Sequence, residues 1–137
     1  MSFAHVPRIM ALTASLLLTA AAHADDLADF HAAVDEAMAD YRTAMATLET
    51  QSQQETSAAV NQLRHTWQSI NTRFGHDRPA AFADDEQYSS MFTLIDMRLV
   101  GVLLTIDMGN RDAARAGLAP IEDTLTRLSA KSAPPAQ

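Results

Sequence analysis

Two side chains near the start of the chain are spaced for binding a metal ion or a cofactor. His31 and Asp35 lie four residues apart in a segment with helical periodicity. Both can therefore point at one ion, or the carboxylate can orient the imidazole. The ordinary alternative is a half-exposed histidine in a surface ion pair, because one His–Asp pair falls short of the three or four ligands of a metal site. His65 is expected on the solvent side of its helix, and His76 in a loop.

Methionine thioethers could bind Cu(I). Met38 and Met45 lie on an apolar seam, where methionine simply fills space. The chain has no Met-x-x-Met cluster and no His-Met pair. We therefore expect core packing for the five methionines after the first 24 residues, which are Met38, Met45, Met91, Met97 and Met108.

Catalytic patterns are missing from the sequence. Asp96 and Asp107 interrupt an apolar segment, and a carboxylate inside a bundle is costly unless it is paired or bound to metal. The alternative is a place at the solvent edge, or a contact with an arginine of a neighbouring helix. Neither a Ser-His-Asp order, a Gly-rich phosphate loop nor a His-Glu-x-x-His motif occurs. We therefore expect no enzymatic activity.

The first 24 residues resemble a secretory signal peptide. Arg8 precedes an apolar run over residues 9–22, and Ala22-His23-Ala24 is a small-x-small cleavage site. This pattern predicts a mature chain that begins at Asp25 and lies in the periplasm or is secreted. We identify no second run of about 20 apolar residues, so we expect no membrane insertion after cleavage. The chain has no Cys, which excludes disulfides, thiolate metal sites and covalent c-type haem.

The charge balance limits the classes of partner. Removing 24 of the 137 residues leaves 113, enough for one domain with its own core. Ten basic residues become nine without Arg8, against 17 acidic ones, so the net charge is −8. Nucleic acids and anionic membranes require a basic surface. A nucleic-acid partner is therefore excluded, and a protein partner or a second copy remains open.

Four amphipathic segments predict an all-α chain folded as an antiparallel four-helix bundle over residues 25–130. They span about 26–49, 53–74, 85–108 and 111–130, followed by a disordered tail over residues 131–137. Ser52 and Asn110 are expected N-caps, and Gly75 a left-handed cap. Trp67 should be buried, and Pro120 should kink or divide the last helix. The third segment is apolar around most of its circumference, which indicates deep burial or a second contact face.

The stretch Asp25-Asp-Leu-Ala-Asp-Phe-His31 is similar to the opening of periplasmic four-helix-bundle cytochromes of the cytochrome b562 and c′ type. The stretch Gly109-Asn-Arg-Asp-Ala-Ala is also similar in character to the start of their last helix. The resemblance implies the bundle fold, and it implies an axial haem ligand at the seventh mature residue, which is His31 here. The family's second ligand, a His near the end of the last helix, has no counterpart in residues 125–129, and the Cys-x-x-Cys-His motif is absent.

Three hypotheses of function follow. The leading one is a non-catalytic periplasmic binding protein that acts through a metal or haem ligand or through a protein partner. The first alternative is a haem or copper carrier or redox protein that uses His31 with Met38 or Asp35, although the absence of any cofactor is the favoured expectation. The second alternative is an interaction protein that dimerises through the third helix, for which Leu103→Glu would be the test.

Overall fold

The helices follow the amphipathic segments of the sequence. The computed structural model describes the backbone of residues 6–132 and the side chains of residues 26–132. Over this stretch the chain forms α1 (Val6–Thr50), α2 (Gln53–Phe74), the 3-10 helix η1 (Ala80–Phe82), α3 (Tyr88–Asp107) and α4 (Arg111–Ala130). Residues 6–132 contain no β-strand. The prediction of an all-α chain with four long helices is confirmed.

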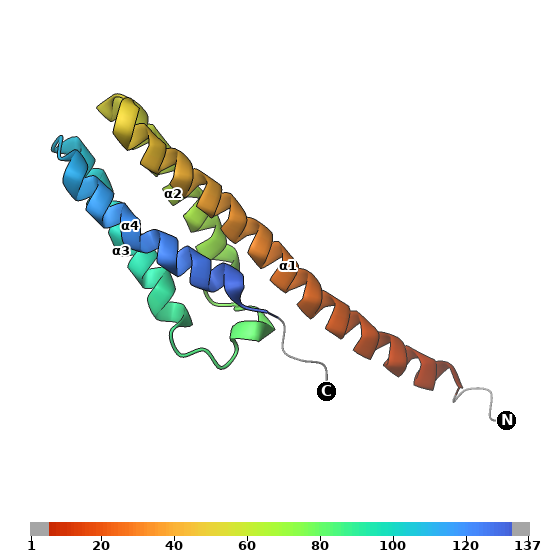
Figure 1. Cartoon of the computed structure of the whole chain (residues 1–137). Helices are drawn as coiled ribbons and strands as arrows, with labels where there is room; N and C mark the ends of the chain where they lie inside the picture. The colour runs from red at the N-terminus through yellow and green to blue at the C-terminus, as the bar shows by residue number, and fades with distance from the viewer. Residues whose placement is uncertain (1–5, 133–137) are drawn as a thin grey trace.

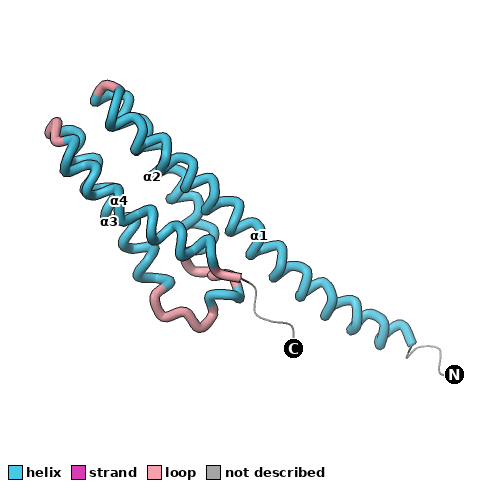
Figure 2. The backbone as a smooth tube through the Cα atoms, in the orientation of Figure 1, coloured by secondary structure: helices cyan, strands magenta, loops and turns pink. Residues whose placement is uncertain are grey.

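The four long helices pack around a shared core. α1 contacts α2 and α4, and α3 contacts the same two helices. Figure 1 shows α3 and α4 lying together beside the C-terminal half of α1. Figure 2 shows short loops from α1 to α2 and from α3 to α4 at one end of the bundle, and a longer connection with η1 at the other. Each helix therefore has two neighbours and one outward face.

α1 begins much earlier than the sequence analysis predicts. We expected a first helix over about residues 26–49, but α1 is continuous from Val6 to Thr50. No Pro or Gly occurs between residues 8 and 50, so nothing in this stretch breaks the helix. In Figure 1 the N-terminal half of α1 extends beyond the other helices. The first five residues of the expected signal peptide, and residues 133–137 of the expected tail, lie outside the described residues.

Two N-caps confirm the predicted starts of α2 and α4. The Ser52 hydroxyl accepts the backbone N–H of Glu55 at 3.2 Å. The Asn110 side-chain oxygen accepts the N–H of Ala113 at 3.0 Å. Each bond satisfies a donor that the first turn of a helix cannot pair internally, so local polar residues fix both boundaries.

The prediction for Gly75 is wrong. Its φ is −63°, an ordinary helical value. Glycine is required there by space, because an added Cβ would lie 2.5 Å from the Asn71 carbonyl oxygen. The left-handed glycine is Gly109, with φ +75°, which ends α3. Pro120 does not divide α4, which is continuous from Arg111 to Ala130.

The core consists of the predicted apolar seams. Trp67 is fully buried, as expected, and its ring centre lies 4.7 Å from that of Phe92. Near the longer connection, η1 inserts Phe82 beside Phe30 and Tyr88, with ring centres 5.2 and 4.9 Å away. The buried seam of α3, which holds that helix against α2 and α4, comprises Tyr88, Met91, Phe92, Ile95, Leu99, Val102 and Ile106.

Candidate functional site

His31 lies beside a core residue and keeps one nitrogen unpaired. Its neighbour Phe30 is fully buried, while His31 itself is half-buried with its ring centre 6.2 Å from that of Phe30. The Nε2 atom is buried and has no hydrogen-bond partner among the described residues. A buried polar atom without a partner is costly. This nitrogen is therefore the histidine atom best placed to accept a donor or bind a ligand.

The other two predicted ligands lie in a neighbouring groove. Asp35 and Met38 line a shallow groove of about 320 Å³ between α1 and α4, opposite Thr126 and Ser129. His31 does not line it, and no hydrogen bond or ion pair joins His31 to Asp35 within residues 26–132. Residues 26–132 also hold no group of three His, Asp or Glu side chains able to bind a metal ion. The structure thus brings Asp35 and Met38 together without His31.

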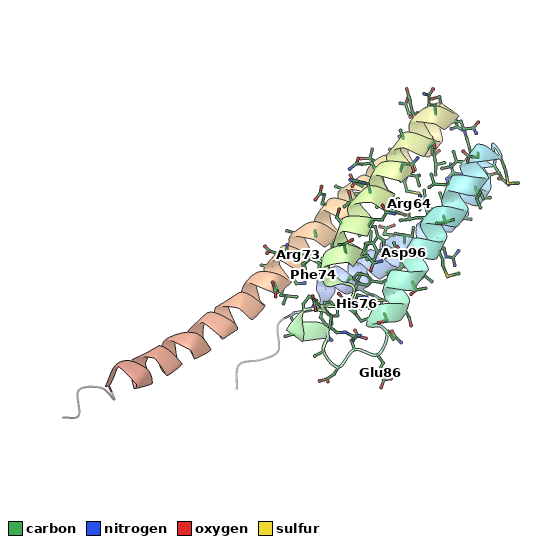
Figure 3. The ribbon with its side chains drawn as sticks, turned by 180° about the vertical axis from the view of Figure 1, so that it is seen from behind. Arg64, Arg73, Phe74, His76, Glu86 and Asp96 are labelled. Atoms are coloured by element: carbon green, nitrogen blue, oxygen red, sulfur yellow. The ribbon has the colours of Figure 1, made fainter. Side chains whose placement is uncertain are left out.

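Asp96 is half-buried in a polar cluster between α2 and α3. It accepts the Asn71 amide N–H at 3.1 Å, and Figure 3 shows Arg64 on the same side of the bundle. Burial raises the pKa of the Asp96 carboxyl, while the Trp67 indole N–H and the charge of Arg64 oppose that rise. The indole N–H lies close enough to lower the pKa, although it makes no hydrogen bond of ordinary geometry. The cluster pairs the carboxylate, so it has a structural role.

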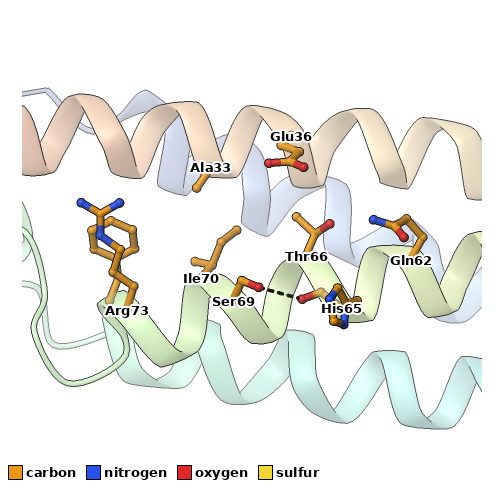
Figure 4. Close-up of a pocket in the computed structure, with 9 residues that line it drawn as sticks. Ala33, Glu36, Gln62, His65, Thr66, Ser69, Ile70 and Arg73 are labelled. Carbon is orange, nitrogen blue, oxygen red and sulfur yellow. Dashed lines mark hydrogen bonds between the residues drawn. The ribbon is translucent and has the colours of Figure 1, made fainter.

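A second polar groove lies between α1 and α2. Figure 4 shows its lining, which includes Glu36, His65, Ser69 and Arg73 around a volume of about 250 Å³. The Ser69 hydroxyl donates to the backbone carbonyl of His65 at 3.3 Å, and no hydrogen bond joins it to the imidazole among the described residues. A nucleophilic serine needs a base at its hydroxyl. This groove therefore lacks an activated nucleophile. His65 is exposed, as predicted, and His76 lies in the loop after α2.

The outward side of α3 is apolar and exposed. Met97 is 69% exposed, Leu104 is 60% and Met108 is 78%. We name as the α3 face the five large exposed apolar side chains, Leu94, Met97, Val100, Leu104 and Met108. They lie opposite the buried seam of the same helix, since α-helical residues advance by about 100° each.

Two predictions are corrected by the α3 face. We expected all five methionines in the core. Met91 is buried and Met38 and Met45 pack against the core, but Met97 and Met108 are exposed. Leu103, proposed as the contact residue of the third helix, is half-buried and packs against the core. Its neighbour Leu104 is the exposed one, because one residue turns the side chain by about 100°.

A groove beside the α3 face enlarges it towards α4. It has a volume of about 450 Å³, and Leu94, Met97, Arg98 and Gly101 of α3 line one side. Ala113 and Gly117 of α4 line the other side, where a single methyl group and the absence of a side chain leave the space open. Gly117 also sets the distance between the helices, because an added Cβ would lie 2.7 Å from Cγ2 of Val102.

α3 has the length and composition of a membrane span. Among the described residues it is the one helix that does. It has 20 residues, and an 18-residue window within it has a mean hydropathy of 1.5, with 33% of that window buried. Asp96, Arg98 and several Ser and Thr residues interrupt its apolar residues, so the expectation that no run of about 20 apolar residues follows residue 24 stays a prediction. A core helix of a soluble bundle passes the same test, so length and composition do not by themselves indicate a span.

Comparison with known proteins adds no relative. No family model, no curated protein and no solved structure matches the chain.

Proposed function

We propose that the protein is a non-catalytic binding protein of the periplasm, where it forms an antiparallel four-helix bundle. It associates there with a protein partner through the α3 face. The observation that carries the proposal is the row of exposed side chains on α3. Single exposed apolar residues are ordinary, but a contiguous apolar patch of more than a few hundred Å² often marks an interaction site. Covering it removes apolar area from water, which favours association.

The electrostatics of the chain support a protein over other partners. The net charge of −7 opposes nucleic acids and anionic lipid surfaces. The α3 face contains no carboxylate, and Arg98 is the charged residue that lines the adjacent groove. Cores of protein interfaces are depleted in charge and enriched in methionine and arginine. The α3 face, with its two methionines, together with Arg98 of the adjacent groove, has that composition.

The test is the size of the protein in a periplasmic extract of its own cells. We expect the wild type to elute larger than a single chain, and Leu104→Glu to elute as a single chain, because the added carboxylate would be buried in the complex. Gln68→Glu adds the same charge at an exposed position of α2 and should leave elution unchanged. Elution of the wild type as a single chain contradicts the proposed partner. An intact mass that includes residues 1–24 contradicts export with cleavage at Ala24.

A haem or copper carrier is a second candidate, favoured by the buried, unpaired Nε2 of His31. Asp35 or Met38 would have to rotate towards it from the α1–α4 groove to complete a ligand set. The test is titration of the purified protein with haem and with Cu(I), comparing wild type, His31→Ala and the exposed-site control His65→Ala. We expect stoichiometric binding that only His31→Ala removes. Binding unaffected by His31→Ala contradicts this candidate.

A further inference from the structure

We infer that the occupant of the α3 face is a second copy of this chain, with the two α3 helices crossing in opposite directions at Gly101. This inference rests on the proposed role of the α3 face and names the partner. Three features of α3 carry it: the symmetry of its exposed side chains about Gly101, the open space at that glycine, and the absence of carboxylates from the contact.

Four of the five side chains of the α3 face are arranged nearly symmetrically about Gly101, whereas the fifth, Val100, has the buried Val102 as its counterpart. Leu94 precedes it by seven residues and Met108 follows it by seven. Met97 precedes it by four and Leu104 follows it by three, and residues at these spacings share one face of a helix. A two-fold axis perpendicular to α3 at Gly101 exchanges the two halves of the helix. Leu94 of one copy then lies opposite Met108 of the second copy, and Met97 lies near Leu104 of the second copy.

Self-complementarity of this kind is what a two-fold dimer requires, because the same patch must serve both partners. A patch built for a different protein has no reason to repeat about its own midpoint. The near-symmetry of the α3 face therefore favours a second copy over an unrelated partner.

Gly101 leaves room at the point where the helices would cross. A Cβ placed on it would have no atom within 4 Å, so the glycine is not required by packing within its own chain. It is exposed and lies on the groove beside α4. Without a side chain, it lets a second backbone approach closely, and the flanking Met97 and Leu104 can enclose the crossing point.

Charge favours the same contact. Two cleaved chains, each with 9 basic and 17 acidic residues and so a net charge of −8, repel each other over most of their surfaces. The carboxylates Asp96 and Asp107 lie away from the line through Leu94, Gly101 and Met108, since each is displaced from it by more than 90° around the helix. Along this line two copies can therefore meet without opposing carboxylates.

The size of the face indicates reversible association. The distance from Leu94 to Met108 is about 21 Å at 1.5 Å per residue, and a helix with its side chains is about 10 Å wide. The five side chains of the α3 face are also far fewer than the roughly 20–30 residues that each partner contributes to a standard stable interface. We therefore expect dimers that form with increasing concentration.

The experiment uses the absence of cysteine from the chain. Gly101→Cys introduces one thiol at the crossing point, where the two copies would bring their Cα atoms within disulfide range. Ala58→Cys is the control, on the exposed side of α2. Both are exported, purified reduced and then oxidised at equal concentration, and dimers are followed on non-reducing gels. We expect Gly101→Cys to cross-link about tenfold faster or more, through its higher effective concentration, and added Leu104→Glu to remove the difference.

Equal rates for the two cysteine variants overturn the second copy as occupant. The proposed function is tested separately by the elution experiment. If Leu104→Glu still releases the protein from a larger complex in the extract, the α3 face binds a different protein. If the wild type elutes there as a single chain even after the extract is concentrated to the range in which the purified protein is tested, the proposed function fails as well.

Discussion

Replacing Trp67 by alanine is the sharpest test of how α2 is oriented in the bundle. The side chain is fully buried, and its ring centre lies 4.7 Å from that of Phe92. Truncating a buried tryptophan costs about 3–5 kcal/mol of the free energy of unfolding. The lost aromatic pair contributes about 0.5–1.5 kcal/mol beyond its buried area, so we expect about 4–5 kcal/mol.

A loss of this size is large against the 5–15 kcal/mol typical of a domain. The assay is urea unfolding followed by far-UV circular dichroism, because the variant lacks the only tryptophan of the chain. The slope m should stay unchanged while the midpoint falls. Gln68→Ala, at the exposed neighbouring position, should stay within about 0.5 kcal/mol of wild type. A loss below about 1 kcal/mol for Trp67→Ala would refute the burial of this face of α2.

Two further predictions concern buried polar groups. The Tyr88 hydroxyl donates to the Phe74 carbonyl at 2.7 Å in the core; Tyr88→Phe leaves that carbonyl unpaired and should cost about 1–2 kcal/mol in urea unfolding, and an unchanged midpoint would contradict this. Burial raises the pKa of the Asp96 carboxyl, so the folded state holds the proton more tightly than the unfolded state. The contribution of Asp96 to the free energy of unfolding therefore falls as pH rises from the usual pKa of an aspartate through the raised one. Asp96→Asn should therefore gain stability relative to wild type between about pH 3 and about pH 7; a difference that does not change with pH would show that the carboxyl is not perturbed.

Much of the fold could be predicted because it depends on local signals. The spacing of apolar residues located the four helices, and Ser52 and Asn110 marked two starts through bonds to their own first turns. Gly75 was misjudged because its role comes from the position of the Asn71 carbonyl oxygen. In the sequence, a glycine required by such a contact looks the same as an ordinary glycine cap.

The candidate site was harder to predict, because exposure depends on which side of a helix meets its neighbours. α3 is apolar on nearly all sides, so its pattern indicated a second contact face without locating it. Leu103 and Leu104 are the same type of residue. Only the packing of α3 against α2 and α4 leaves Leu104 exposed and Leu103 half-buried. A helical projection centred on the buried Leu99 and Ile106 carries the signal that separates them, since Leu104 falls on the opposite side.

The relative positions of the candidate ligand side chains could likewise not be predicted from the sequence. His31 and Asp35 have the spacing of a shared site, yet Asp35 lines the α1–α4 groove and His31 does not. Four residues correspond to slightly more than one turn, and the imidazole is drawn towards the core beside Phe30. Spacing placed both residues on adjacent parts of one helix, but tertiary packing separated their side chains.

The most direct measurement of the central claim is sedimentation equilibrium of the purified, exported protein over a series of concentrations, for wild type and Leu104→Glu. We expect the wild-type mass to rise from one chain towards two as concentration increases, and Leu104→Glu to remain a single chain with an unchanged helical circular dichroism spectrum. A wild type that stays a single chain throughout, or a Leu104→Glu variant that associates as the wild type does, would contradict association of this protein with itself through the α3 face.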